Sequence, residues 1–209
     1  MTYQKQVDKM HYQGQAYRSG ERWVSYFHQI SLVREVAPRT VLEVGVGEGV
    51  VARELKNTGI DVTTVDIAED LSPDVVGSVT SLPFEGNSFD VVLAAEILEH
   101  ISFEDVLQAM KEISRVARTY AVISVPHPGY VFAIGYKLPL LPRIDLFTQI
   151  PFFWKTHTFN GEHYWELGKK GYPISRFLKV ARNANFQLVT LHKFTDDPGH
   201  RFFLFKKTQ

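Results

Sequence analysis

The sequence predicts a doubly wound α/β fold built on a mostly parallel sheet of seven strands. Short runs that are almost wholly apolar, such as residues 89–95, alternate with segments of helical periodicity. This alternation is typical of parallel sheets whose strands are buried on both faces. A cluster of glycines directly follows the first apolar run, and 209 residues with 44% hydrophobic content suffice for one sizeable core.

The first part of the chain supplies the parallel strands and their helices. A covering helix is expected over residues 23–36, where apolar residues recur every three or four positions. Strands are expected at 40–44, 61–65, 75–79, 89–95 and 120–125, with helices over 50–56 and 103–117. Strands that alternate with helices favour right-handed parallel crossovers.

The last third of the chain has a different pattern. A helix is expected over 174–184, after Pro173, and strands over 187–194 and 201–205. Asp196, Asp197, Pro198 and Gly199 lie between these strands and favour a turn. The pattern therefore predicts a hairpin that adds an antiparallel C-terminal strand to the sheet.

Charge and composition exclude several classes of function. The chain has 23 basic and 23 acidic side chains, which disfavours nucleic acid as a partner. It has no cysteine, so disulfides, thiolate nucleophiles and cysteine-bound zinc are excluded. Residues 1–15 are polar, and no apolar run is long enough for a transmembrane segment. We expect a cytoplasmic protein.

The segment LEVGVGEG, residues 42–49, is the most informative motif. A strand ends in Gly45, Gly47 and Gly49 and continues into a helix. Glycine lets the backbone turn sharply and lets a ligand approach it. A dinucleotide-binding loop would have its third glycine at position 50, where this chain has Val50.

A carboxylate follows the second predicted strand. Asp66 lies at the end of that strand, where it can accept hydrogen bonds from both hydroxyls of a ribose. The alternative is that Asp66 only caps the next helix and that the glycines are ordinary turn residues.

In these motifs the chain resembles the class I S-adenosylmethionine-dependent methyltransferases, in the broad group that acts on small molecules. The resemblance covers about residues 40–125, with a weaker match at 163–186. Four blocks match in order: LEVGVGEG, VDIAED, SLPFEGNSFDVVLAAEILEH and AVISVP. It implies a Rossmann-like fold, with S-adenosylmethionine as cofactor and S-adenosylhomocysteine as product.

The resemblance also implies roles for individual residues. Glu43 would orient the glycine loop, and Gly45, Gly47 and Gly49 would line the methionine part of the cofactor. Asp66 would hold the ribose, Ile67 would lie against the adenine, and Ala95 would offer its carbonyl to the amino group of the cofactor. Family members commonly have an aspartate at the position of Ser78, so Ser78 or the backbone of Val79 would hold the adenine less strongly.

Candidate catalytic groups follow the fourth strand. Methyl transfer to an alcohol or amine needs a base to remove a proton. His100 is the preferred base, because histidine titrates near neutral pH. Glu96 and the later His163 are further candidates, and the alternative is that residues 98–100 only shape the loop.

A metal site is the second possibility for the same residues. Methyltransferases of small-RNA 3′ ends and of quinone pathways carry a similar E-x-x-E-H run that binds a divalent ion. By this resemblance Glu96, Glu99, His100 and His163 would hold a metal, whereas the leading interpretation has none.

The organisation implied is one methyltransferase domain over 1–209. It would comprise an N-terminal helical cover (1–38), a cofactor-binding core (39–125), an acceptor-side insertion (126–172) and a C-terminal helix and hairpin (173–209). The insertion is rich in aromatic residues and prolines, and we expect it to cover a small-molecule acceptor. Its apolar part, 129–154, could form a surface helix that makes weak contact with a membrane. The sequence does not predict the oligomeric state.

The acceptor stays open between a glycan, a lipid and a metabolite, methylated at oxygen or nitrogen. Other classes are a nucleotide-sugar or nicotinamide enzyme, which Val50 disfavours, and a catalytically silent S-adenosylmethionine-binding module, which the departure at Ser78 leaves open.

Overall fold

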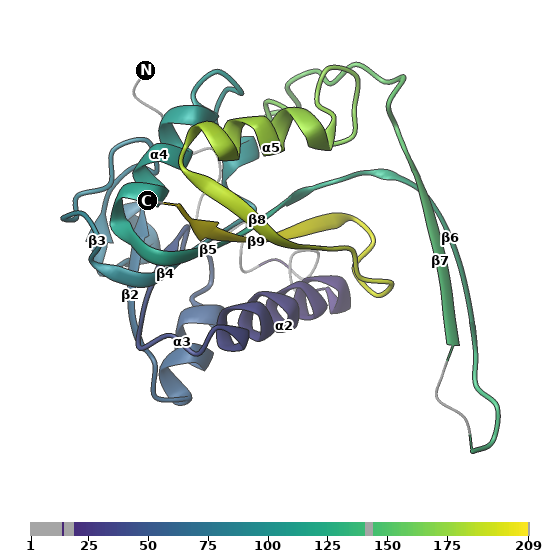
Figure 1. The fold of residues 1–209 in the computed structure, drawn as a ribbon, viewed down its shortest axis with the longest axis horizontal. Helices are drawn as coiled ribbons and strands as arrows, with labels where there is room; N and C mark the ends of the chain where they lie inside the picture. Colours follow the sequence, from purple (N-terminus) through teal and green to yellow (C-terminus); the bar gives the residue numbers. More distant parts are fainter. Residues whose placement is uncertain (1–13, 15–18, 141–143, 209) are drawn as a thin grey trace.

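The computed structural model describes residue 14, residues 19–140 and residues 144–208. Its strands and helices follow one another along the chain in the predicted alternation (Figure 1). The strands of the main sheet are β1 (Thr40–Val44), β2 (Asp61–Asp66), β3 (Val75–Val76), β4 (Phe89–Ala95), β5 (Ala117–Pro126), β8 (Phe186–His192) and β9 (His200–Lys207). The helices are α2 (Gly20–Glu35), α3 (Val50–Asn57), α4 (Val106–Val116) and α5 (Ile174–Asn183), with short 3-10 turns η1 (Glu69–Leu71) and η2 (Leu98–His100).

The main sheet has seven strands in the order β3-β2-β1-β4-β5-β9-β8. Strands β3, β2, β1, β4 and β5 pair in parallel, whereas β9 pairs antiparallel with both β5 and β8. The prediction of a doubly wound, mostly parallel, seven-stranded sheet with an antiparallel C-terminal strand is therefore confirmed.

Helices cover both faces of the sheet. Helices α2 and α3 lie on one face, and α4 and α5 lie on the other (Figure 1). Successive strand residues point to opposite faces, so Val41 packs in the cluster with α2 and α3 while Leu42 packs in the cluster with α4 and α5. Both side chains are fully buried. The near-continuous apolar strands of the sequence are explained by this burial on two faces.

Two elements are shorter in the structure than predicted by three residues or more. Strand β3 ends at Val76 rather than at residue 79, because the chain turns at Gly77 and Ser78 pairs in an isolated bridge with Ser81. A side chain at position 77 would collide with Pro83. Helix α4 begins at Val106 rather than at residue 103.

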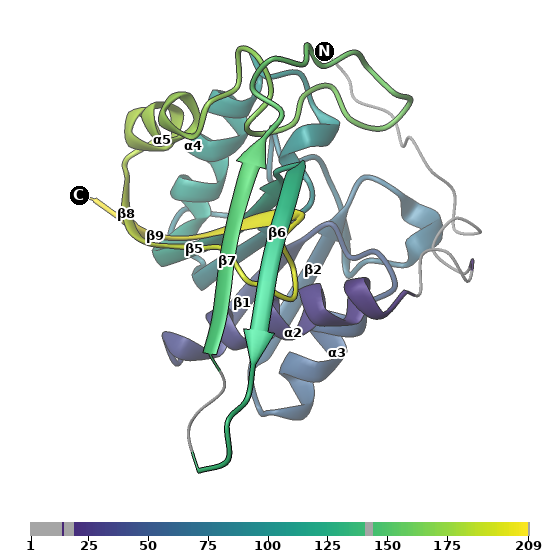
Figure 2. The same cartoon turned by 90° about the vertical axis from the view of Figure 1, so that its right-hand side faces the viewer.

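The apolar insertion is a hairpin and not a helix. Strands β6 (Gly129–Tyr136) and β7 (Ile144–Pro151) pair antiparallel over their full length and extend away from the main sheet (Figures 1 and 2). The expectation of a surface helix over 129–154 is therefore wrong. Valine, isoleucine and aromatic residues favour strands, and a short apolar run does not by itself distinguish a strand from a helix.

No helix in the described ranges combines the length and the apolar character needed to cross a membrane.

The packing of β9 against α5 predicts the effect of a core truncation. Phe203 is fully buried, with its ring 5.6 Å from that of Phe205 and 5.0 Å from that of Phe177. We expect Phe203→Ala to lower the free energy of unfolding by about 3–5 kcal/mol. Val189→Ala, at a position on β8 that is 52% exposed, is the control and should stay within about 0.5 kcal/mol. Urea unfolding checks this, and a loss below about 1 kcal/mol for Phe203→Ala would contradict the packing.

Candidate active site at the carboxyl edge of the sheet

The glycine loop turns sharply after β1. Gly45 and Gly47 have φ values of 84° and 51°, which are left-handed conformations that favour glycine. Gly49 precedes α3 as its N-cap residue, and its N–H donates to the carbonyl of Val46 at 2.8 Å. A Cβ atom at Gly45 would collide with the side chain of Ile97, so the turn has no room for a side chain there.

Asp66 at the end of β2 points toward this loop. One carboxylate oxygen accepts a hydrogen bond from the N–H of Val46 at 2.9 Å, and the other accepts from the N–H of Ala68 at 2.8 Å. Burial raises the pKa of Asp66 above its ordinary value, although these backbone donors oppose the shift. Each oxygen keeps a second lone pair, which a ribose hydroxyl could use.

The loop and Asp66 line one pocket with the end of β4. Counted together with the open space at its mouth, the pocket has a volume of about 560 Å³. Its lining comprises Arg22, Tyr26, Gln29, Glu43, Val44, Gly45, Val46, Gly47, Glu48, Val50, Val51, Asp66, Leu93, Ala95, Glu96 and Ile97. Helix α2 therefore contributes one wall, which the glycine motif alone did not reveal.

Glu43 is buried beneath the loop. Burial raises the pKa of Glu43 to about 8, and one of its oxygens has no hydrogen-bond partner. At neutral pH the side chain is thus a protonated acid that can donate a hydrogen bond. A buried polar atom at the wall of a pocket fits a site built to hold a polar ligand.

The residues expected around the adenine lie next to Asp66. The N–H of Gly77 donates to the carbonyl of Asp66 at 2.9 Å, which places Ser78 and Val79 beside the end of β2. The Ser78 hydroxyl lies 2.9 Å from that of Thr80. Ile67 is 37% exposed. Contact of Ile67, Ser78 and Val79 with the adenine stays a prediction.

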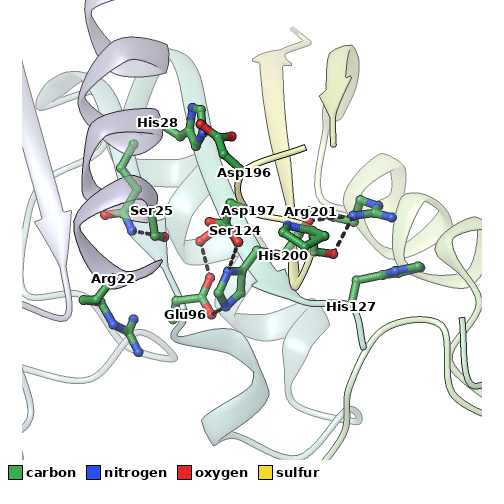
Figure 3. Close-up of polar contacts among 12 residues, drawn as sticks. Arg22, Ser25, His28, Glu96, Ser124, His127, Asp196, Asp197, His200 and Arg201 are labelled. Carbon is green, nitrogen blue, oxygen red and sulfur yellow. Dashed lines mark hydrogen bonds and ion pairs between the residues drawn. The ribbon is translucent and has the colours of Figure 1, made fainter. Parts of the chain in front are cut away.

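Glu96 belongs to a buried polar group that the sequence did not predict. One oxygen of Glu96 lies 2.9 Å from Nε2 of His200, and the other accepts a hydrogen bond from the Ser124 hydroxyl. Nδ1 of His200 lies 2.6 Å from the Asp197 carboxylate, so the imidazole sits between two carboxylates (Figure 3). Glu96 itself has a φ of 56°, a conformation uncommon for residues other than glycine.

Glu96 and His200 shift each other's pKa values. The carboxylates of Glu96 and Asp197 raise the pKa of His200 to about 10 against the opposing effect of burial. The positive charge of His200 and two hydrogen bonds lower the pKa of Glu96 to about 2, again against burial. Both side chains are therefore charged at neutral pH, next to the pocket.

His100 and His163 meet on the acceptor side. Their rings lie 5.1 Å apart, edge to face, and Nδ1 of His100 lies 3.1 Å from the carbonyl of Glu162. His163 lies 3.1 Å from the Glu166 carboxylate. Burial and the neighbouring His163 lower the pKa of His100 to about 4. The structure thus brings together two of the three residues expected to be catalytic.

Glu99 completes a group that could hold a metal ion. The ligand atoms of Glu99, His100 and His163 lie within 4.8 Å of one another. Glu99 is fully buried, and neither of its oxygens has a hydrogen-bond partner. Burial and the charge of Glu96 raise its pKa well above the ordinary value. Glu96 does not join this group, because its carboxylate is bound to His200 and Ser124.

The second half of the insertion holds this region in place. The N–H of Tyr164 donates to the carbonyl of Glu99 at 2.8 Å, and the indole of Trp165 donates to the carbonyl of Leu98 at 3.1 Å. Trp165 is fully buried. Residues 163–165 therefore lie on η2, next to the end of β4.

Sequence reasoning missed His200 because its role depends on sheet topology. His200 begins β9 and pairs with Pro126, so it reaches Glu96 across a separation of 104 residues. The acidic turn before β9 was recognised only as a turn. The one signal in the sequence was Asp197 three residues before His200.

The fold and the site define a class of protein. The strand order, the glycine turn and the facing aspartate are those of the class I S-adenosylmethionine-dependent methyltransferases, with a Rossmann-like sheet. A family model described as a methyltransferase domain matches residues 42–124. The match covers less than half of the chain, and together with the fold it supports a methyltransferase of this class, whose cofactor is S-adenosylmethionine.

Solved structures of other methyltransferases have a similar fold. The 1,6-didemethyltoxoflavin-N1-methyltransferase of Burkholderia thailandensis is 16% identical, with a TM-score of 0.61 over 88% of this chain and 78% of its own. The CcbJ methyltransferase of Streptomyces caelestis is 18% identical, with a TM-score of 0.59 over 88% of this chain and 95% of its own. The magnesium protoporphyrin IX methyltransferase of Synechocystis PCC 6803, solved with bound cofactor, is 13% identical, with a TM-score of 0.59 over 90% of this chain and 80% of its own.

A curated relative is an uncharacterized protein of Methanocaldococcus jannaschii. It is 24% identical over 121 residues, which are 58% of this chain and 44% of the relative. The chain thus matches less than half of that protein's length.

The ion pair of Glu96 and His200 predicts a pH-dependent stability. The folded pKa of His200 is raised from 6.5 to about 10, so its stabilisation is complete below pH 6.5 and is lost as the pH rises toward 10. The pKa of Glu96 is lowered from 4.5 to about 2, so its stabilisation is complete above pH 4.5 and is lost as the pH falls toward 2. We expect His200→Gln to cost about 3–5 kcal/mol, because it leaves Glu96 buried without its counter-charge.

Urea unfolding across pH measures this cost, which should be largest between pH 4.5 and 6.5. His192→Gln on β8 is the control, because none of the ion pairs among the described residues includes His192. A cost for His200→Gln that is equal at pH 6 and pH 10 would rule out the charged pair.

Proposed function

We propose that this chain transfers a methyl group from S-adenosylmethionine to oxygen or nitrogen of a small-molecule acceptor such as a glycan, a lipid or a metabolite. The contact between Asp66 and the backbone of Val46 carries the proposal, because it sets a ribose-binding carboxylate directly against the glycine turn. Cytoplasmic location and the division of the chain into four parts stay predictions.

The residues of the pocket have separable roles in this proposal. Asp66 binds the ribose hydroxyls, and Glu43 and the glycine turn hold the amino-acid end of the cofactor. The carbonyl of Ala95 accepts from the amino group. When bound, the cofactor supplies an electrophilic methyl group. The protein's task is then to hold the acceptor in line with that methyl group and to exclude water.

The acceptor side lies between η2 and the returning insertion. His100 and His163 lie there together, where a neutral imidazole can take the proton that an acceptor loses. Glu96, held by His200 and Ser124, presents a fixed negative charge at the boundary with the cofactor pocket. We infer that Glu96 orients the reacting groups rather than removing a proton, because both of its oxygens are already held by His200 and Ser124.

The alternative is a divalent-metal-assisted O-methyltransferase of RNA ends or quinones. The unpartnered oxygens of Glu99 beside His100 and His163 support it, because one carboxylate and two imidazoles suit a divalent transition metal. A catalytically silent S-adenosylmethionine-binding module is the third candidate. It would bind the cofactor without turnover.

Cofactor binding tests the first step. We expect calorimetry to show binding of S-adenosylmethionine and S-adenosylhomocysteine, and none of NAD. Asp66→Asn should weaken both Kd values about 10–100-fold, through loss of charge-assisted hydrogen bonds to the ribose. Asp61→Asn, an exposed aspartate at the start of the same strand, is the control and should bind normally. Equal affinity of Asp66→Asn and the wild type for S-adenosylmethionine would contradict the proposal.

Methyl transfer tests the second step. With labelled S-adenosylmethionine and a small-molecule extract as the source of acceptors, we expect transfer that EDTA leaves unchanged. His100→Gln should lower kcat by about 10²–10⁴-fold without changing the cofactor Kd. His192→Gln is the matched control. Unchanged turnover in His100→Gln would remove this residue from the mechanism. Loss of turnover with EDTA and recovery with Mn²⁺ would favour the metal-assisted alternative.

A further inference from the structure

The hairpin of β6 and β7 forms an arm, defined here as residues 129–151. It extends away from the main sheet, and Figure 2 shows its two strands side by side along their length. Its described residues form a separate two-stranded sheet. Such a hairpin is only marginally stable in water by itself, so a partner surface would be expected to stabilise the arm.

One face of the arm carries large apolar side chains at seven of its eight described positions. The strand register places Tyr130 opposite Ile150, Ile134 opposite Leu146, and Tyr136 opposite Ile144. Cross-strand partners point to the same face, and every second residue shares it. This apolar face comprises Tyr130, Phe132, Ile134, Tyr136, Ile144, Leu146, Thr148 and Ile150, all exposed, with exposed fractions of 40–67% for the seven large apolar members.

The opposite face of the arm makes hydrogen bonds and a cation–π contact with the body of the chain. Gln149 donates to the carbonyls of His127 and Pro198 at 2.8 and 3.0 Å. Lys193 lies 5.5 Å from the centre of the Phe147 ring. Gln149 and Phe147 alternate with the members of the apolar face, so this opposite face fixes the base of the arm to the body. On the apolar face Tyr130, at the base, packs against Phe152 and Trp154, with ring centroids 5.1 and 6.3 Å apart, and it still stays 55% exposed.

The size of the apolar face matches that of a stable protein interface. A whole aromatic side chain contributes about 150–250 Å² of surface, so seven large side chains exposed by about half present on the order of 700 Å². A stable interface buries about 800 Å² per partner, whereas the largest apolar patch of a typical monomer is about 300–600 Å².

A second protein sheet covers such a surface better than a bilayer does. The outer edges of β6 and β7 have no strand partner among the described residues, and unpaired backbone N–H and C=O groups are strongly disfavoured in hydrocarbon. The sequence of the arm carries Lys137, Arg143 and Asp145, so its formal net charge is only +1, which leaves little attraction for anionic lipid. A flat apolar face of alternating side chains instead suits face-to-face sheet packing.

We propose that the arm is a dimerisation element, and that its apolar face packs against the same face on a second copy of this chain. A two-fold axis makes the interface self-complementary, so one patch serves both copies. The dimer buries the seven large apolar side chains and leaves each cofactor pocket in its own subunit.

Solution mass tests the proposal. Light scattering of the full chain should give twice the monomer mass of 23.9 kDa at micromolar concentration. Ile134→Lys, at the centre of the apolar face, should give the monomer mass with an unchanged melting profile of the body. Val189→Lys, at an equally open apolar position on β8, is the matched control and should remain a dimer.

Cysteine cross-linking gives an independent test, because the chain has no native cysteine. Single cysteines at Phe132 or Ile134 should yield a covalent dimer with a short bifunctional maleimide. Val76→Cys, exposed on β3 at the far edge of the main sheet, should not. A monomer at all concentrations, or a dimer that survives Ile134→Lys without cross-linking through the arm, would overturn the proposal. Monomers that sediment with phosphatidylcholine vesicles would assign the face to a membrane instead and would equally overturn it.

Discussion

The hydrogen bond from the N–H of Val46 to the carboxylate of Asp66 is the contact on which the site depends. It exists because β1 and β2 pair in parallel, with Val44 opposite Val65, so that both strands end at the same edge of the sheet. The chain must then turn away from β1 without covering the carboxylate, and residues in left-handed conformations achieve this. The glycines and the aspartate are thus two parts of one geometric requirement.

The antiparallel strand β9 provides the second constraint. Its pairing with β5 brings His200 beside Ser124 and Glu96, at the point where the parallel strands end. A buried imidazolium is costly unless negative charge faces it, and here Glu96 at the end of β4 and Asp197 in the turn before β9 supply that charge. Glu96 is consequently fixed in position at the boundary between the cofactor pocket and the acceptor side.

The insertion between β5 and α5 divides into two parts of opposite character. Its second part returns to η2 and buries Trp165, and it brings His163 beside His100. Its first part leaves the body and exposes apolar side chains on one face of a hairpin. One segment of the sequence therefore supplies a wall of the site and a separate surface, and its high aromatic content serves both.

The sequence by itself determined the architecture and the cofactor-facing half of the site. Apolar strands alternating with amphipathic helices specify a doubly wound sheet. Strand, glycines and helix follow one another locally in LEVGVGEG, so the sequence already places Gly45 and Gly47 at the end of a strand, and the structure shows that they line one pocket with Asp66. Only the tertiary structure decided the contacts between distant segments. The partner of Glu96 is His200 rather than a metal ligand set, because β9 enters the sheet beside β5. The apolar run at 129–151 is a hairpin. Its strands are stabilised by pairing with each other, and the local sequence pattern does not show that pairing. Periodicity is a property of neighbouring residues, whereas the balance of buried charges depends on which strands the fold places side by side.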